Sequence, residues 1–328
     1  MSKSEPKTLD ELMAYLRDSK GILIEGMEQR QKLMNIGYYH GYKGYRYINK
    51  ASNTIQYNNF DELIAIYDFD TRLKALFYPY VMQIETAIKN YVLDSILSFV
   101  HSDSFIDIYN TLLDNYKRFS PSVPEYKKEI KRRLDLRNRI YRVQSDAYGN
   151  GNKIAEHYLT NESNLPIWAI FELLSLGEFG YFMSCLNFGV RKNVSVNLGI
   201  EQRDDTEAMM PQRLIYATKD LRNAIAHNDV IFDTRFKTNS IKQQVSNAIT
   251  NHMRVSNITF KTITDYLILI VYQLSLIKVS KDDILKLING FEECTEELRS
   301  VIPINVYNQI ILTDNKAKIR KLREFVSM

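Results

Sequence analysis

The chain has 328 residues, of which 45% are hydrophobic and 25% charged, and its formal net charge is +4. This composition excludes a disordered chain, and the low content of glycine (12) and proline (7) argues against a turn-rich β-sandwich or barrel. Because the net charge is small, any nucleic-acid contact must come from a local basic patch. The two cysteines, Cys185 and Cys294, lack CxxC spacing, which excludes a zinc ribbon.

No segment of the sequence is typical of secretion or membrane insertion. Residues 1–10 are polar and lack the apolar stretch of a signal peptide. The longest apolar run, 266–279, contains polar residues and falls short of the about 20 residues that span a bilayer. With only two cysteines, the reducing cytosol is the natural compartment, so we expect a cytoplasmic protein without membrane contact.

The N-terminal third combines helical patterns with an unusual tyrosine-rich segment. Residues 7–36 predict two short helices that end at Gly37. Tyrosines then recur through 38–47, and weak alternation on either side of a turn predicts a small β-hairpin. Apolar residues spaced three or four apart over 61–100 predict a long helix that has Asp61 as its N-cap and continues, kinked, through Pro79.

The rest of the chain is predicted to be helical, which makes the protein all-α. A loop is expected at 146–152, and a connector with a short helix at 188–207. Helices are predicted over residues 104–118, 121–145, 165–177, 178–187, 211–228, 240–254, 259–279, 281–299 and 304–325.

The predicted helix over 211–228 separates an apolar side from a polar side. At about 100° per residue, one side carries Met210, Leu214, Ala217, Leu221 and Ile225. The opposite side presents Lys219, Arg222, Asn223, Ala226 and His227. Arg222 and His227 lie about 140° apart around the axis, and a long arginine side chain can lean over the small Ala226 between them.

An arginine and a histidine on one helix face suit the cleavage of RNA. Histidine exchanges protons near neutral pH, and arginine stabilises charge on phosphate oxygens. Together, His227 and Arg222 can activate a ribose 2′-hydroxyl against its own 3′-phosphate without a metal ion. The products would be a 2′,3′-cyclic phosphate, or a 3′-phosphate, and a 5′-hydroxyl. The alternative is a surface arginine with a histidine that caps the helix dipole.

Four stretches of the chain resemble known families. Residues 221–229, Leu-Arg-Asn-Ala-Ile-Ala-His-Asn-Asp, resemble the Arg-polar-x-x-x-His signature of HEPN domains. The stretches 36–42, 66–73 and 165–177 resemble the AbiD/AbiF-like group of abortive-infection phage-resistance proteins, in that family's order. The resemblance covers about residues 20–235. One departure is His40, where members of the family often have arginine or lysine, and another is Lys43-Gly44-Tyr45 in place of Ser-Gly-Tyr.

The resemblance implies a fold, an activity and partners. The fold would be a HEPN-type helical bundle at 60–238, after N-terminal helices and a tyrosine-rich hairpin at 1–59 and before a helical extension at 239–328. The activity would be that of a metal-independent endoribonuclease toxin in phage defence, with Arg222, Asn223 and His227 as catalytic residues and no cofactor. The protein would form a homodimer, and a small structured RNA would be a further partner besides the RNA substrate.

Two other residues are predicted to support the site. Glu172 is the only acid among the apolar residues 165–176 and requires a partner, for which Arg222 or Arg72 is suited. Lys219 is predicted to help hold the RNA backbone. The alternative for Glu172 is a partly exposed helix residue.

Basic residues at two places are predicted to contact RNA. Segment 127–142 carries a net charge of +6, more than the whole chain, and is either an RNA contact or a solvated helix face. The tyrosine-rich segment is either a base-stacking surface or a core edge. The predicted RNA-binding residues are Lys127, Lys128, Lys131, Arg132, Arg133, Arg137, Arg139, Lys43 and Arg46. The alternative function is a non-catalytic helical module that binds RNA or protein through the same polar face.

Overall fold

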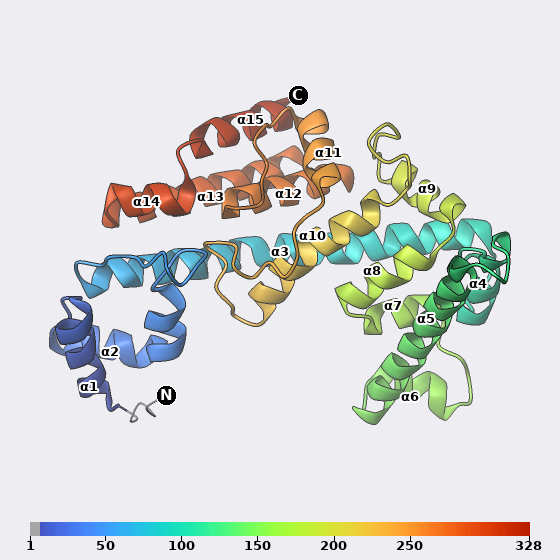
Figure 1. Ribbon diagram of the computed structural model, residues 1–328, viewed down its shortest axis with the longest axis horizontal. Helices are drawn as coiled ribbons and strands as arrows, with labels where there is room; N and C mark the ends of the chain where they lie inside the picture. The colour runs from blue at the N-terminus through green and yellow to red at the C-terminus, as the bar shows by residue number, and fades with distance from the viewer. Residues whose placement is uncertain (1–6) are drawn as a thin grey trace.

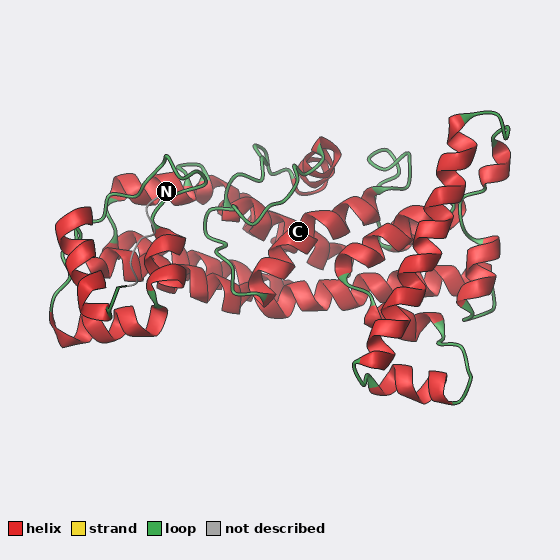
Figure 2. Cartoon of the chain, turned by 60° about the horizontal axis from the view of Figure 1, so that its bottom comes forward, coloured by secondary structure: helices red, strands yellow, loops and turns green. Residues whose placement is uncertain are grey.

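The structure, a computed structural model, describes residues 7–328, which form helices joined by loops of different lengths, with a long one after α10 (Met210–Ala226) (Figures 1 and 2). It has no β-strand within this range, which confirms the predicted all-α class. Most of the polar segment 1–10, in which we predict no signal peptide, lies outside the described residues. No helix of residues 7–328 is both long enough and apolar enough to cross a membrane.

Two short helices form the N-terminal arm, as predicted. They are α1 (Leu9–Ala14), which a π-helical turn prolongs to Ser19, and α2 (Gly26–Ile36). Gly37 ends α2 with φ +68°, in the left-handed region that favours glycine. The predicted β-hairpin is wrong: residues 38–43 form a π-helical turn, and the strand pairing reduces to one antiparallel bridge between Tyr47 and Thr54.

The long helix α3 (Phe60–Phe99) is the axis of the molecule. Its 40 residues span about 60 Å at 1.5 Å per residue, and Figure 1 shows it crossing nearly the whole picture. Its buried stripe continues past Pro79, as predicted. The N-cap is Asn59 rather than Asp61, since the Asn59 side chain accepts a hydrogen bond from the backbone N–H of Glu62 at 3.0 Å.

The helices after α3 form a second arm, at the right of Figure 1. The predicted loop at 146–152 is wrong over most of its length, because α5 continues to Gly149 and only residues 150–152 separate it from a further helix, α6, which the sequence did not suggest. The helices are α4 (Phe105–Thr111), α5 (Pro124–Gly149), α6 (Lys153–Thr160), α7 (Ile167–Leu173), α8 (Leu176–Cys185) and α9 (Phe188–Asn197).

Helix α10 (Met210–Ala226) crosses α3 near the middle of the molecule and packs against both α3 and α8. The close approach to α8 depends on Gly180, where an added Cβ would lie 3.1 Å from the side chains of Ile215 and Tyr216. The helix predicted over 304–325 is broken at Leu312 (φ +60°). The C-terminal helices are α11 (Gln243–Met253), α12 (Ile263–Leu276), α13 (Lys281–Val301), α14 (Ile304–Ile311) and α15 (Asn315–Ser327).

One continuous apolar core runs through the molecule, from Leu16 to Val326. Helix α13 packs along α3, and every residue of α12 except Ser275 is buried. The N-terminal arm, the middle helices and the C-terminal helices all contribute side chains to this core. The division of the chain into three parts, with boundaries after residues 59 and 238, stays a prediction.

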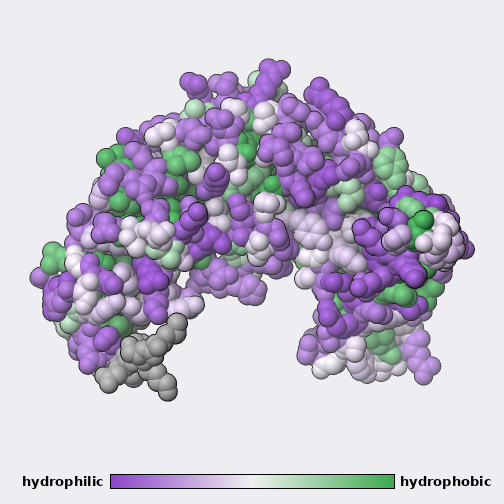
Figure 3. All heavy atoms as spheres, viewed as in Figure 1, coloured by the Kyte–Doolittle hydropathy of each residue, from purple (hydrophilic) through white to green (hydrophobic). Residues whose placement is uncertain are grey.

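The molecule has the shape of an arch (Figure 3). In that view a hollow separates the arm that contains α1 and α2 from the arm that contains α5 and α6. The C-terminal end of α10 and the loop after it lie at the upper margin of this hollow. The arrangement leaves the predicted catalytic end of α10 at the surface.

Candidate active site at the end of α10

Helix α10 packs as its sequence pattern predicts. The five apolar residues expected on one side, Met210, Leu214, Ala217, Leu221 and Ile225, are all buried. On the other side Ala226 and His227 are exposed, and Arg222 and Asn223 are partly exposed. Burial of the apolar stripe against α3 and α8 therefore fixes which residues of the motif reach solvent.

A buried carboxylate on α3 orients the Arg222 side chain. The Nε atom of Arg222 donates to Oε2 of Glu85 at 2.8 Å, and the Nζ atom of Lys89 lies 3.1 Å from the other oxygen of Glu85. The Nη1 atom of Arg222 also donates to the Asn223 side chain at 3.3 Å. Glu85 is only 7% exposed, whereas the Arg222 side chain is 25% exposed. The guanidinium is thus held on one edge, and its Nη2 atom makes no hydrogen bond within residues 7–328.

The suggested pairing of Glu172 with Arg222 is wrong, because Glu85 is the acid that binds Arg222. Glu172 is exposed on α7 and forms no ion pair within the described part of the chain, and Arg72 pairs with Glu297 instead. One feature of the sequence could have indicated Glu85: it lies four residues before Lys89, and both interrupt an apolar stripe. Such residues require partners when the stripe is buried.

His227 is the C-cap residue of α10. Its backbone N–H donates to the Asn223 carbonyl at 2.9 Å, and Asn228 then turns the chain with φ +57°. The helix therefore ends two residues before the predicted end at 228. The imidazole is exposed and makes no hydrogen bond to other residues of the 7–328 range.

The segment after His227 is fixed by a buried network around Asp70 of α3. One oxygen of Asp70 accepts hydrogen bonds from the backbone N–H groups of Ile231 and Phe232, each at 2.7 Å. The other accepts from the Tyr45 hydroxyl at 2.7 Å and lies 2.8 Å from Lys74 Nζ. Burial raises the pKa of the Asp70 carboxyl, and Lys74 and these hydrogen bonds oppose that rise. Four donors thus surround a side chain that is 0% exposed.

The same network connects three separate parts of the sequence. Lys74 also donates to the Asn228 side chain at 2.9 Å, which ties the residue next to His227 to α3. Burial raises the pKa of Tyr45, so its hydroxyl stays protonated and donates to Asp70. The sequence pattern did not suggest either role, although Asp70 and Lys74 repeat the four-residue spacing of Glu85 and Lys89.

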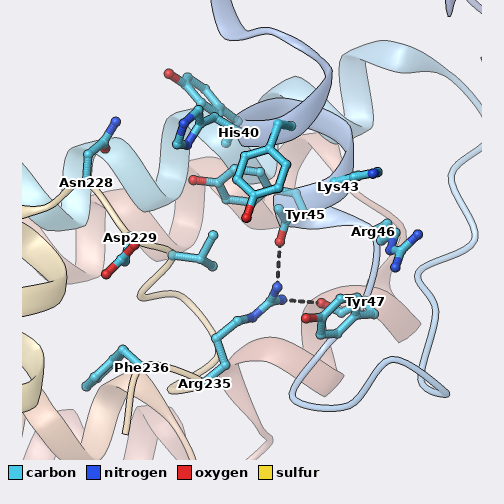
Figure 4. A pocket seen from close by; sticks show the side chains of 13 residues that line it. His40, Lys43, Tyr45, Arg46, Tyr47, Asn228, Asp229, Arg235 and Phe236 are labelled. Carbon is cyan, nitrogen blue, oxygen red and sulfur yellow. Dashed lines mark hydrogen bonds between the residues drawn. The ribbon is translucent and has the colours of Figure 1, made fainter. Parts of the chain in front are cut away.

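Arg235 clamps the tyrosine-rich segment to the loop after α10. Its guanidinium donates to the backbone carbonyls of Gly44 at 2.7 Å and Tyr47 at 2.5 Å, and it pairs with the buried Asp233 (Figure 4). It also lies 4.1 Å from the centre of the Tyr47 ring. A cavity of about 500 Å³ opens between the two segments, and the predicted RNA contacts Lys43 and Arg46 lie on its wall.

The basic residues of α5 divide into two groups. Arg132 donates to the carbonyl of Ser184, and Arg133 donates to that of Tyr109 and stacks on its ring. Arg139 is exposed, with its guanidinium 4.6 Å from the centre of the Tyr181 ring. The remaining residues of α5 that are predicted to contact RNA are exposed and form no ion pair within residues 7–328: Lys127, Lys128, Lys131 and Arg137.

Lys219 lies apart from the end of α10 that carries His227. It pairs with Asp220 at 3.0 Å and lines a different cavity of about 480 Å³ beside α11, together with Tyr216 and Ile241. The structure therefore brings Arg222 and Asn223 into direct contact and places His227 at the end of their helix. Within residues 7–328 neither Lys219 nor Glu172 forms a hydrogen bond with Arg222.

Fold and site together define an all-α protein whose polar arginine–histidine helix end is positioned by two buried acid–lysine pairs. The chain belongs to the Abi-like protein family, whose profile matches residues 31–233, more than half of the chain. This family comprises abortive-infection phage-resistance proteins of the AbiD/AbiF group, which confirms the resemblance drawn from the four motifs. No curated protein and no solved structure matches the chain.

The matched region contains α10 itself and both acid–lysine pairs of α3 that hold its C-terminal end and the segment after it. The cavity residues Tyr39 and His40, the buried Asp70 and the Leu174 carbonyl, to which Lys89 donates at 3.4 Å, come from the stretches 36–42, 66–73 and 165–177. These are the stretches that carry the resemblance. In this chain they converge on α10 and on the segment that follows it.

Proposed function

We propose that the protein is a HEPN endoribonuclease that acts in phage defence by abortive infection. The observation that carries the proposal is the arrangement at the end of α10. Arg222 is held on one edge by the buried Glu85 and remains partly exposed, five residues before an exposed histidine whose side chain makes no hydrogen bond within the described residues. The match to the Abi-like family and the Arg-polar-x-x-x-His motif support the same activity.

In the proposed reaction, the 2′-oxygen of a ribose attacks the adjacent 3′-phosphorus and the bond to the 5′-oxygen breaks. The His227 imidazole accepts the proton of the 2′-hydroxyl or returns one to the departing 5′-oxygen. The free Nη2 edge of Arg222 donates to the phosphate oxygens as their charge increases. Asn223 holds the guanidinium from its other side. The products are a 2′,3′-cyclic phosphate and a 5′-hydroxyl end.

A dimer would supply the second proton-transfer group. One histidine cannot remove a proton and donate another in the same step, whereas two copies related by a two-fold axis bring two histidines to one cleft. The hollow beside α10 in Figure 3 provides an open approach for RNA or for a second copy. Control by a small structured RNA belongs to the same proposal and rests on the family resemblance.

The proposal is tested by expressing wild type, His227→Ala and the control His101→Ala, which changes another exposed histidine. Wild type and His101→Ala are expected to arrest growth and to produce new RNA ends with 5′-hydroxyl groups, and His227→Ala to do neither. Arg222→Lys keeps the charge but loses the planar fork, so it is also expected to lose cleavage. If purified wild type, freed of co-purifying RNA, binds RNA but leaves it uncut, the protein is the non-catalytic binding module.

A further inference from the structure

A cavity lies between the tyrosine-rich segment and the loop after α10, and two of its lining residues directly follow His227 of the proposed active site. Asn228 and Asp229, the two residues that follow His227, line one wall. Residues 39–47 line the facing wall. Its volume of about 500 Å³ falls within the range of small-ligand sites. A group bound here would lie next to the end of α10.

The positive charge on the facing wall is available to a ligand. Lys43 and Arg46 are exposed, and neither forms an ion pair with a carboxylate of residues 7–328. Their nearest partners are ring faces, Tyr38 at 5.3 Å from Lys43 Nζ and Tyr47 at 5.8 Å from the Arg46 guanidinium. Arg235, by contrast, is fully used in clamping the wall. Two unpaired cations side by side match the charge of a phosphate.

An aromatic ring at the rim is equally available. Tyr39 is 71% exposed, whereas Tyr42 and Tyr45 are part of the core and Tyr38 packs against it. Within residues 7–328 its only aromatic contact is with His40, edge to face, with 5.2 Å between the ring centres. Exposed aromatic rings beside basic residues are the surfaces on which unpaired bases stack.

The opposite wall carries a carboxylate and an amide instead of cations. Figure 4 shows Asn228 and Asp229 across the cavity from Lys43 and Arg46. The Asp229 carboxylate is exposed and forms no ion pair within the described range, and the Asn228 amide still has free N–H donors because only its oxygen is used by Lys74. A carboxylate repels phosphate but accepts hydrogen bonds from ribose hydroxyls and base amino groups. The cavity therefore has a phosphate side and a base or ribose side.

We propose that this cavity binds one unpaired nucleotide of a single-stranded RNA, next to the bond that is cut. The phosphate lies against Lys43 and Arg46, the base stacks on Tyr39, and Asn228 and Asp229 contact the base edge or ribose. The RNA must be single-stranded here, because bases within a duplex do not expose their faces. The position relative to the cut rests on the proposed nuclease function, whereas the binding of the nucleotide does not.

Binding is measured with His227→Ala protein and a labelled, unstructured oligoribonucleotide, by fluorescence anisotropy. Added to this background, Tyr39→Ala is expected to weaken binding about tenfold, and Tyr39→Phe to retain it because the ring remains. Lys43→Ala with Arg46→Ala is expected to reduce the slope of log K against log salt by about 0.7, the value for one lost phosphate contact on a single strand. The controls are Tyr78→Ala, another exposed tyrosine, and Lys153→Ala with Lys192→Ala, which removes two exposed cations outside the cavity.

Each outcome decides the proposal. Weaker binding in the cavity variants, with unchanged controls and unchanged thermal midpoints, supports it, as does weaker binding of a duplex of the same sequence. Unchanged affinity and salt slope in the cavity variants would overturn it. So would a loss confined to a free mononucleotide, which would make the cavity a small-ligand site. Cavity-dependent binding by a wild-type protein that cuts no RNA would refute the nuclease and leave the nucleotide site standing.

Discussion

Helix α3 carries two buried acid–lysine pairs that look alike in the sequence and act differently in the structure. Asp70 and Lys74 hold the segment after α10, and Glu85 and Lys89 hold Arg222. All the donors around Asp70 are buried or part of the backbone. Glu85 instead bonds a guanidinium that is still 25% exposed.

The difference separates two uses of a buried charge. A carboxylate whose donors all lie in the interior fixes the path of the chain, and a ligand cannot reach it. A carboxylate that holds one edge of a partly exposed arginine directs the remaining edge toward solvent. We therefore expect the first pair to govern stability and the second to govern activity.

The largest effect on stability is expected from Asp70→Ala. It removes the acceptor of two backbone N–H groups and of Tyr45, and it leaves the buried ammonium of Lys74 without its carboxylate. Breaking a buried pair from one side costs about 3–5 kcal/mol, measurable by urea unfolding. The control is Asp94→Ala, an exposed acid on the same helix, which should change stability by about 0.5 kcal/mol or less. Equal effects of the two substitutions would refute the anchoring role of Asp70.

Glu85→Gln is expected to lower activity more than stability. Arg222 can turn to solvent when the charge is lost, and the buried Lys89 can still donate to a glutamine oxygen and to the Leu174 carbonyl, so the free energy of unfolding should fall by about 1–3 kcal/mol. Cleavage should fall about 100-fold, because a misplacement of about 1 Å costs that much. Activity and urea unfolding are measured on the same preparations, with Asp94→Asn as the control. A variant that loses stability but cleaves normally would show that Glu85 does not position Arg222 for catalysis.

The basic residues of α5 should also separate into residues that stabilise the fold and residues that bind RNA. Arg133→Ala removes hydrogen bonds to buried carbonyls and should cost about 1–3 kcal/mol of stability. Lys127→Ala, Lys128→Ala and Lys131→Ala together should leave stability unchanged and reduce the RNA salt slope by about 2. Unfolding curves and anisotropy titrations at several salt concentrations distinguish the two. An unchanged slope in the triple variant would exclude α5 as an RNA contact.

The smallest expected effect is on the pH dependence of stability and comes from His252. This histidine is partly buried and has no hydrogen-bonded partner in the described chain. Burial lowers the pKa of its imidazole below the ordinary value of about 6.5. The unfolded chain therefore binds a proton more readily, and stability is full above about pH 6.5 and falls as the pH drops below it. Replacing His252 with Gln should flatten that fall, as followed by thermal unfolding from neutral to acidic pH. An unchanged profile would assign the acid sensitivity to other groups.

Periodicity predicted the helices well where the apolar stripe was long. The 40 residues of α3 and the buried side of α10 were both evident, because burial of one helix face imposes a spacing of three or four residues. Short-range signals were less reliable. The glycines and asparagines at 146–152 suggested a loop, yet α5 continues to Gly149, since glycine is tolerated in the last turn of a helix.

The site was predictable only in part. Residues Arg222, Asn223 and His227 stand together in the sequence, and their spacing on one helix is a local property. Their partners are remote: Glu85 is 137 residues away from Arg222, and Asp70 is 161 residues away from Ile231. Glu172 was proposed because it interrupts an apolar run, but the short helix α7 turns it to solvent. A local pattern cannot indicate which of two acids faces a given arginine.

The sequence by itself determined the all-α class, the family and the helix that carries the arginine and histidine, because these depend on composition, on motifs and on the period of one helix. Only the tertiary structure decided which charges are available. The crossing of α10 over α3 buried Glu85 and Asp70 beside their partners, the docking of α5 occupied Arg132 and Arg133, and the Arg235 clamp left Lys43 and Arg46 open to solvent. A side chain's charge is written in the sequence, but its accessibility depends on which distant backbone and side-chain groups the fold brings to it.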